Sequence, residues 1–170
     1  MKTNFSKICL TGLLLGAASW PARGAVSIFL HIDGVPGDSV VSGHNSDNDV
    51  TEFEFSAFTN APGRPSFSLS IQKAVNAASP ALALECASGG TYPTATLSCY
   101  KNTGSLATTA FYSITVTNVS VVGISTDATT SATPTESLSL QFTGVQWTYV
   151  PQNQSGGYGT PIVTSFPTAP

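Results

Sequence analysis

The sequence predicts a mainly β protein, an antiparallel β-barrel or sandwich with one short helix. Only 9% of the 170 residues are charged, whereas Thr, Ser, Gly and Val are abundant, a composition that favours strands over helices. Short segments of alternating apolar and polar residues, separated by turn residues, recur along the chain. Two of the longest segments change their apolar phase midway, which is how strands bend when a sheet closes into a barrel.

Three alternating segments in the first half of the chain are expected strands. In the second of them, Phe53 and Phe55 share one face and Glu52 and Glu54 the other, as in a strand with one buried side. Turn sequences rich in glycine and proline separate the three segments. They cover residues 26–32, 50–58 and 66–71.

One short helix is expected in the middle of the chain. Ser79 is a suitable N-cap, and Pro80 fits the first helical position because its missing N–H would be unpaired there. Gly89 and its neighbour supply the positive φ that ends a helix. Pro93 then forces an extended backbone, so a strand is expected to run from this point to Tyr100.

The second half is expected to hold two long β segments and a tail. Residues 107–122 change phase near Asn118, and residues 136–150 change phase at Gly144. Both changes indicate a bulge or bend. Residues 125–135, which are small and polar, are expected to form a flexible loop between the segments.

The expected domain organisation has three parts: a signal peptide (1–24), a barrel domain (25–151) and a flexible C-terminal tail (152–170). Lys2 and Lys7 precede an apolar run that ends near Ala18, the order found in secretory leaders. Cleavage is expected after Gly24, with a competing site at residues 17–19. The apolar run is shorter than the ~20 residues that span a bilayer. We therefore expect a secreted or periplasmic protein without a stable membrane anchor.

The charge balance argues against nucleic acid as a partner. From residue 25 onward the chain has three basic and nine acidic residues, which gives a net charge of −6. A surface with this balance repels a phosphate backbone.

Two groups of residues suggest calcium binding or glycosidase chemistry, each with a simpler alternative. His44, Asp47 and Asp49 offer ligands in a polar loop, as in a calcium site. The loop lacks both the following glycine and the distal glutamate of a full calcium loop, so a solvated loop is the favoured interpretation. Glu52 and Glu54 resemble a glycosidase pair, but carboxylates two apart on a polar strand face are usually solvated.

His31 is a third candidate, for catalysis in a hydrolase. No nucleophile motif accompanies it, and an exposed or groove-facing strand histidine is the favoured interpretation. No phosphate loop, zinc-ligand spacing, nucleophile elbow or dinucleotide fingerprint occurs in the chain,. We therefore expect no cofactor and no enzymatic activity.

Four short segments together resemble a known family. They are FLHIDGVPGDS, the approach from His44 to Val50, ECASGGTYPTATLSCYK and LQFTGVQWTYVPQ. Their order and spacing, from about Ile28 to Pro151, resemble the Hcp family, the haemolysin-coregulated tube proteins of type VI secretion. The N-terminal leader departs from typical cytoplasmic members of that family.

The resemblance implies a structural, non-catalytic protein whose fold is a small antiparallel β-barrel of two packed sheets with one short helix. It implies a hexameric ring, a homo-oligomer that stacks into a hollow tube, with secretion spike or effector proteins as partners. The loop with Asp38, His44, Asp47 and Asp49 would reach the next ring. An alternative is an exported binding module of the same fold that acts as a monomer or dimer outside the secretion tube.

Cys86 and Cys99 are a candidate disulfide pair. Cys86 lies where the resembling family often has cysteine, and Cys99 follows in the next strand. In an oxidising compartment they would close a 14-residue loop,, which stabilises a fold by roughly 3 kcal/mol.

Overall fold

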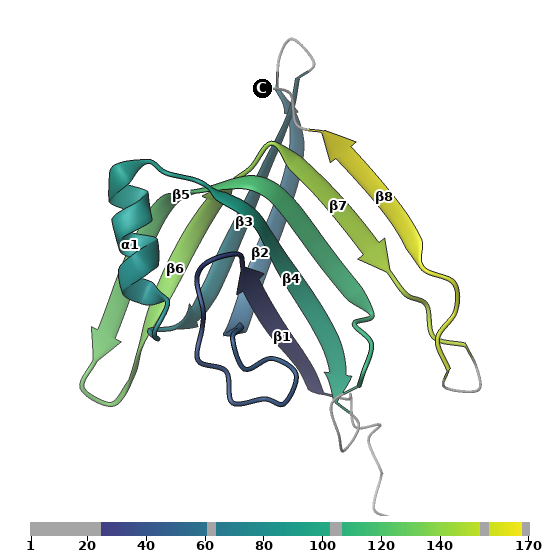
Figure 1. Cartoon of the computed structure of the whole chain (residues 1–170), viewed down its shortest axis with the longest axis horizontal. Helices are drawn as coiled ribbons and strands as arrows, with labels where there is room; N and C mark the ends of the chain where they lie inside the picture. The colour runs from purple at the N-terminus through teal and green to yellow at the C-terminus, as the bar shows by residue number, and fades with distance from the viewer. Residues whose placement is uncertain (1–24, 61–63, 103–106, 154–156, 168–170) are drawn as a thin grey trace, which may run out of the picture.

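The computed structural model describes residues 25–60, 64–102, 107–153 and 157–167. The expected leader, residues 1–24, lies outside these ranges. Figure 1 shows one helix flanking a curved sheet. The elements are β1 (Ala25–Ile32), β2 (Asn48–Asn60), β3 (Arg64–Ala74), α1 (Ser79–Ser88), β4 (Tyr92–Asn102), β5 (Tyr112–Thr129), β6 (Ala132–Gln141), β7 (Gly144–Tyr149) and β8 (Ile162–Pro167).

Six strands close into an antiparallel barrel, which confirms the predicted fold class. Their order is β4-β1-β2-β3-β6-β5, and β5 pairs back with β4. The remaining strands, β7 and β8, extend from β5 as a two-stranded ribbon (Figure 1). The barrel therefore consists of a fully closed part and strands that project beyond it.

The core fills the barrel with the inward side chains of the alternating strands. Phe53 and Phe55 pack against this core, while Glu52 and Glu54 are exposed on the opposite face of β2, as their alternation predicted. Fully buried apolar side chains come from five of the six barrel strands and from the helix, and they include Leu30, Ile71, Leu82, Leu97, Ile114, Val116, Leu138 and Leu140.

Strand β5 bends where the sequence predicts it. Asn118 has a φ of 51°, a left-handed conformation that asparagine tolerates better than most residues. Before the bend, β5 pairs with β4 and β7; after it, from Ser120 to Thr129, β5 pairs with β6. The second predicted phase change falls at Gly144, where the chain leaves β6 and begins β7.

Two segments expected to lack regular structure contain strands. The predicted loop 125–135 is the tip of a hairpin in which β5 runs to Thr129 and β6 begins at Ala132. The predicted flexible tail contains β8, which pairs with β7 along its whole length. Backbone pairing forms both strands, and their exposed side chains carry no periodic apolar signal,.

Helix α1 ends as expected but begins differently. Gly89 has a φ of 73°, and its N–H donates to the Glu85 carbonyl at 3.0 Å. The N-cap residue is Ala78, and no side chain caps the helix. The Ser79 hydroxyl instead accepts the Asn76 N–H at 3.0 Å. No helix in the described part of the chain is long and apolar enough to cross a membrane.

The expected disulfide is not formed: Cys86 and Cys99 are both free. The helix lies beside the start of β4, where the Tyr92 hydroxyl donates to the Ala81 carbonyl at 3.5 Å. Cys99 is seven residues further along the strand, roughly 23 Å at the usual rise per residue. A disulfide needs Cα atoms within about 7 Å, so the strand carries Cys99 away from the helix.

Candidate assembly surface

The predicted ring-stacking loop between β1 and β2 folds back onto the barrel and does not extend from it. The Gly37 N–H donates to the Ser46 carbonyl at 2.8 Å, and the Ser39 N–H to the Asp47 carbonyl at 3.1 Å. A Cβ atom at Gly37 would overlap the Asp47 carbonyl, so glycine permits this close approach. Asp38 and Asp49 are exposed at either side of the loop.

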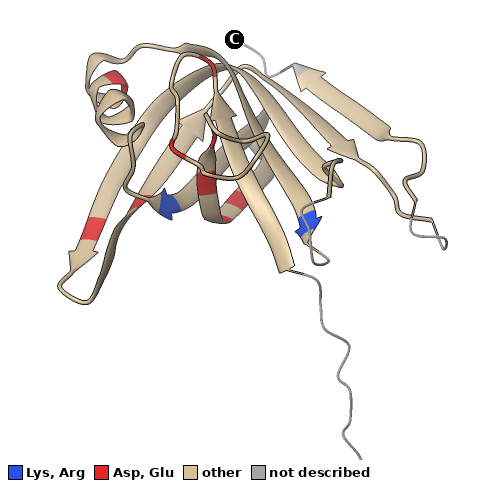
Figure 2. Ribbon diagram, turned by 60° about the horizontal axis from the view of Figure 1, so that its bottom comes forward, with Lys and Arg blue, Asp and Glu red and all other residues tan. Residues whose placement is uncertain are grey.

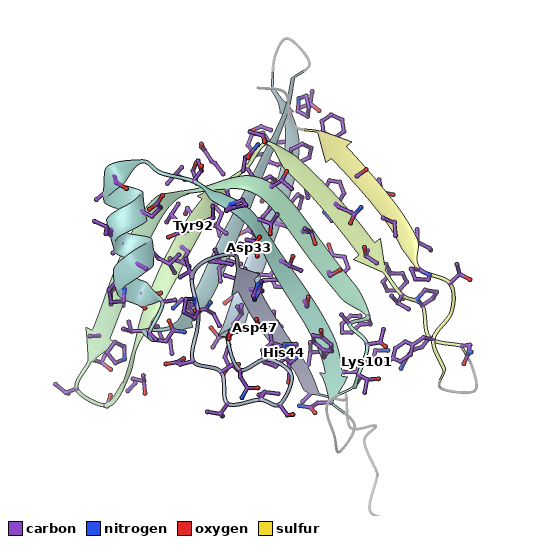
Figure 3. All side chains as sticks on the ribbon, viewed as in Figure 1. Asp33, His44, Asp47, Tyr92 and Lys101 are labelled. Carbon is purple, nitrogen blue, oxygen red and sulfur yellow. The ribbon has the colours of Figure 1, made fainter. Side chains whose placement is uncertain are left out.

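A cluster of side chains, called the latch below, holds this loop against the outer faces of β1 and β4 (Figure 3). The Asp47 carboxylate accepts hydrogen bonds from His44 Nδ1 at 2.6 Å and His31 Nδ1 at 2.8 Å. The His44 ring stacks on Phe29 with centroids 3.9 Å apart and meets Tyr100 edge-on at 4.8 Å. Because of this cover, Phe29 is buried although it faces outward.

The electrostatics of the latch follow from its burial and its carboxylate. Burial raises the pKa of Tyr100, and the negative charge of Asp47 raises it further, while a hydrogen bond with Ser98 lowers it. His31 is half exposed and also lies 3.5 Å from Asp33. Among the described residues, no three His, Cys, Asp or Glu side chains are placed to hold a metal ion. The hydrogen bonds and ring contacts of this cluster position the loop against β1 and β4.

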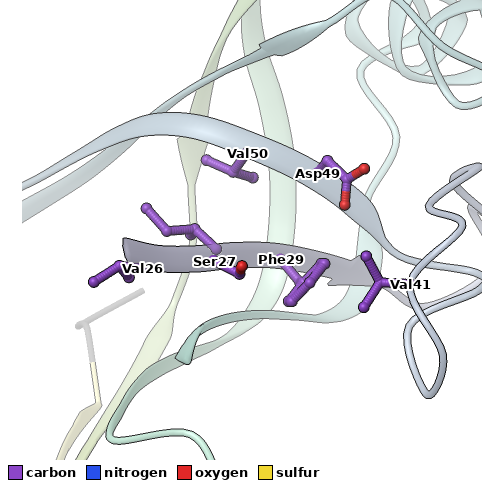
Figure 4. Close-up of a pocket in the computed structure, with 7 residues that line it drawn as sticks. Val26, Ser27, Phe29, Val41, Asp49 and Val50 are labelled. Carbon is purple, nitrogen blue, oxygen red and sulfur yellow. The ribbon is translucent and has the colours of Figure 1, made fainter. Parts of the chain in front are cut away.

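Within the described residues, strand β2 has a long edge without a partner strand next to this loop. It pairs with β1 only through residues 48–50, and the two strands then separate. A cavity of about 310 Å³ lies where they part (Figure 4). Its lining residues are Val26, Ser27, Ile28, Phe29, Val41, Asp49 and Val50. From Glu52 to Asn60, β2 pairs with β3 on one side only.

A second open edge lies on β5. After Val119 the strand pairs with β6 alone among the described strands. Helix α1 packs against β5, and the residues of β5 from Ser125 to Thr129 are all exposed. The four-stranded sheet β2-β3-β6-β5 therefore ends in two different open edges. Its outer face is polar, with exposed side chains that include Glu52, Glu54, Ser70, Gln72, Ser137, Ser139 and Gln141.

Charge is distributed unevenly over the molecule (Figure 2). Carboxylates lie on the loop and on the outer face of β2, whereas Lys73 is buried. Lys101 hydrogen-bonds Gln152 and lies 5.5 Å from the centroid of the Phe111 ring. The described surface therefore offers carboxylates but few cations.

An aromatic cluster fixes the β7–β8 ribbon to the β2–β3 hairpin. Trp147 meets Phe55 edge-on with centroids 5.3 Å apart and Phe67 at 6.0 Å. Phe166 of β8 meets Phe67 at 5.5 Å. These contacts tie β8 to β3 and hold the projecting hairpin in place.

The sequence analysis missed a buried ion pair that lies under α1. Lys73 Nζ lies 2.5 Å from Glu136 Oε1, with both side chains inaccessible to water. Lys73 is in phase with Leu69 and Ile71, and Glu136 is in phase with Leu138. That alternation was the available signal, because it places both charges on the core face.

Comparisons with known proteins agree with this architecture. Residues 29–149 match the family described as "Type VI secretion system effector, Hcp". A solved type six secretion system protein is 26% identical, with a TM-score of 0.75, and the match covers 81% of this chain and 92% of that one. Hcp1 from Salmonella typhimurium is also 26% identical, with a TM-score of 0.72 and coverage of 85% and 95%.

A more distant structure shares the fold. A type VI secretion system effector from Yersinia pestis is 21% identical, with a TM-score of 0.70 over 82% of this chain and 98% of that one. A comparison with curated protein sequences finds no significant match. The family match spans most of the chain and coincides with the barrel; the protein belongs to the Hcp family of type VI secretion system effectors.

Proposed function

We propose that the mature chain, residues 25–170, assembles head-to-tail into closed rings as a non-enzymatic tube protein. The observation that carries the proposal is the pair of unlike open edges on one sheet, along β2 and β5. Two different surfaces that meet between copies form a heterologous interface, which closes into a ring when the rotation fits.

In the proposed ring, the open edge of β2 in one copy pairs with the β5 edge of the next. Unpaired N–H and C=O groups along an edge strand are a ready template for another strand. Pairing would continue the sheet from copy to copy, with its Ser- and Glu-bearing face turned to one side of the ring. The number six follows from the family resemblance.

Partners and location complete the proposal. Rings would stack into a tube, with the latched loop of Asp38, His44, Asp47 and Asp49 at the contact between rings. Secretion spike or effector proteins would be its partners. The basic and apolar residues of the segment 1–24 support export across the inner membrane by a signal peptide.

Light scattering on the chain from residue 25 tests ring formation. We expect a mass near six times that of one chain at high protein concentration. A strictly monomeric protein under the same conditions would contradict the ring. Fractionation of cells that make the full chain tests export separately: shortened protein outside the cytoplasm supports the leader, and full-length cytoplasmic protein argues against it.

The second candidate is an exported binding module of the same fold. The feature that favours it is the compact loop, which lies against β1 and β4 instead of extending toward a neighbour. This candidate predicts a monomer or dimer in the same light-scattering experiment.

A further inference from the structure

A chemically unusual cluster lies where β3 leads into α1. Lysine is rarely buried in proteins, yet the Lys73 side chain has no exposed surface, and Glu136 beside it is 2% exposed. The third member is Asn76, three residues after Lys73. Its carboxamide oxygen lies 2.6 Å from Lys73 Nζ. An amine, a carboxylate and a carboxamide thus meet in a site largely shielded from water.

The Asn76 carboxamide is held in one orientation. Its Oδ1 also accepts the Ala78 N–H at 3.1 Å, and its Nδ2 donates to Asn48 Oδ1 at 2.8 Å. Asn48 is itself buried and donates to the Leu30 carbonyl. The Ala78 N–H polarises the carbonyl and would stabilise negative charge that develops on Oδ1 when Lys73 Nζ attacks Cγ,.

The amine is close to the carbon that it would attack. Because a C=O bond is about 1.23 Å long, Lys73 Nζ lies no more than about 3.8 Å from Asn76 Cγ, near the 3–3.5 Å of a reactive geometry. Glu136 Oε1, at 2.5 Å from Nζ, is in position to take a proton from the amine. Nucleophile, electrophile and base are therefore in place.

We propose that Lys73 and Asn76 join in an intramolecular isopeptide bond, with Glu136 as the general acid and base. Glu136 accepts a proton from Nζ, and Nζ attacks Cγ to form a tetrahedral intermediate whose oxyanion is Oδ1. The Cγ–Nδ2 bond then breaks as Glu136 passes this proton to Nδ2, and Glu136 takes the second ammonium proton from Nζ, so that Glu136 ends protonated beside a neutral amide. Ammonia leaves, and no oxidant or other reactant is needed.

The bond would tie the end of β3 to the segment that leads into α1. The link spans only Ala74 and Val75, so it fixes the connection between strand and helix and does not close a large loop. It is independent of the proposed ring, because both residues lie inside one copy and away from the two open edges.

Trypsin digestion followed by mass spectrometry tests the bond in the folded, purified protein. Trypsin does not cut after an acylated lysine, and Arg64 precedes Pro65, which blocks cleavage there. We expect one peptide from the mature N-terminus to Lys101, lighter than its sequence mass by about 17 Da, the mass of ammonia. Cleavage after Lys73 with the full sequence mass would overturn the proposal.

Variants separate the isopeptide bond from other losses of ammonia. N76D should form the same bond with loss of water, so the linked N76D and wild-type proteins should have identical masses. K73R cannot form the bond, whereas it would still form a succinimide at Asn76, so loss of about 17 Da in K73R contradicts the proposal. E136Q should be cut after Lys73 and keep its full mass; if E136Q does not fold, the N76D and K73R comparison decides.

Discussion

The two halves of β5 belong to one strand and have different surroundings. From Tyr112 to Val119 the strand has β4 on one side and, to Thr117, β7 on the other, and Ile114 and Val116 are fully buried. From Ser120 to Thr129 only β6 pairs with it. The closed half carries fully buried core side chains. The open half adds Val121 to the core and contacts α1, and its exposed end leaves backbone groups for a neighbour.

The largest effect on stability is expected in the closed half. Ile114→Ala removes a fully buried side chain and should lower the free energy of unfolding by about 3 kcal/mol. Thr126→Ala, at an exposed site of the open half, should change it by less than about 0.5 kcal/mol. Urea unfolding of monomeric protein measures both; equal losses would remove the distinction between the halves.

The closed half should also be the part sensitive to alkali. Burial raises the pKa of the Cys99 thiol from 9.0 to about 11, and Cys99 pairs with Tyr112. The folded state holds this proton more tightly than the unfolded state. The resulting stabilisation is therefore complete below pH 9 and is lost as the pH rises through 11.

Cys99→Val measures that contribution directly. The difference in unfolding free energy between wild type and variant should shrink by about 2 kcal/mol from pH 8 to pH 11.5. Urea titrations at intermediate pH values give the slope. A constant difference across the range would show that the thiol is not protected by the fold.

Sequence pattern predicted the closed half and missed much of the open half for one physical reason. Ile114 and Val116 alternate because a core selects apolar side chains. The hairpin tip is held by backbone pairing, which leaves no trace in side-chain type. Strand β8 is held by pairing with β7 and by the contact of Phe166 with Phe67, and one such contact is too little for a periodic signal. Lys73 lies beyond the end of the expected strand 66–71, although its phase with Leu69 and Ile71 places it on the core face,.

The candidate site was also predicted only in part from the sequence. His44 and Asp47 were singled out from their residue types, but their latch depends on where β1 and β4 place Phe29 and Tyr100, which local sequence does not specify. The prediction of a Cys86–Cys99 disulfide was wrong because spacing in the sequence says little about the distance between two residues when one lies on an extended strand.

The open half can be tested with two neighbouring serines. Ser125 on the open part of β5 and Ser137 on β6 are directly opposite each other and both exposed, but β6 is paired on both sides. Ser125→Lys should weaken ring formation by about 1–2 kcal/mol per interface, because a charged edge resists pairing. Ser137→Lys should leave it nearly unchanged.

Light scattering over a dilution series measures ring formation by the Ser125→Lys and Ser137→Lys variants. Equal weakening by both variants would indicate that copies meet through the outer face of the sheet. No weakening by either would remove β5 from the interface.

A smaller effect is expected at the loop latch, which lies outside β1 and β4. His44→Ala removes the stack on Phe29 and the bond to Asp47 and should cost about 1 kcal/mol. Hydrogen exchange of the loop amides should become faster while the mass of the ring stays the same. Loss of the ring itself would show that the loop belongs to the side-by-side interface.

The smallest expected effect is that of salt concentration on ring formation. Its sign distinguishes an interface of backbone hydrogen bonds from an interface of salt bridges. From residue 25 the chain carries nine acidic and three basic residues, and of the two described lysines Lys73 is buried. Copies therefore repel one another, and added salt screens that repulsion over about 10 Å at 0.1 M.

Edge pairing through backbone hydrogen bonds should be slightly strengthened between about 20 and 500 mM NaCl, by a few tenths of a kcal/mol. Sedimentation at fixed protein concentration should show more ring at high salt, whereas dissociation there would indicate salt bridges between copies and contradict the assignment of the open edges.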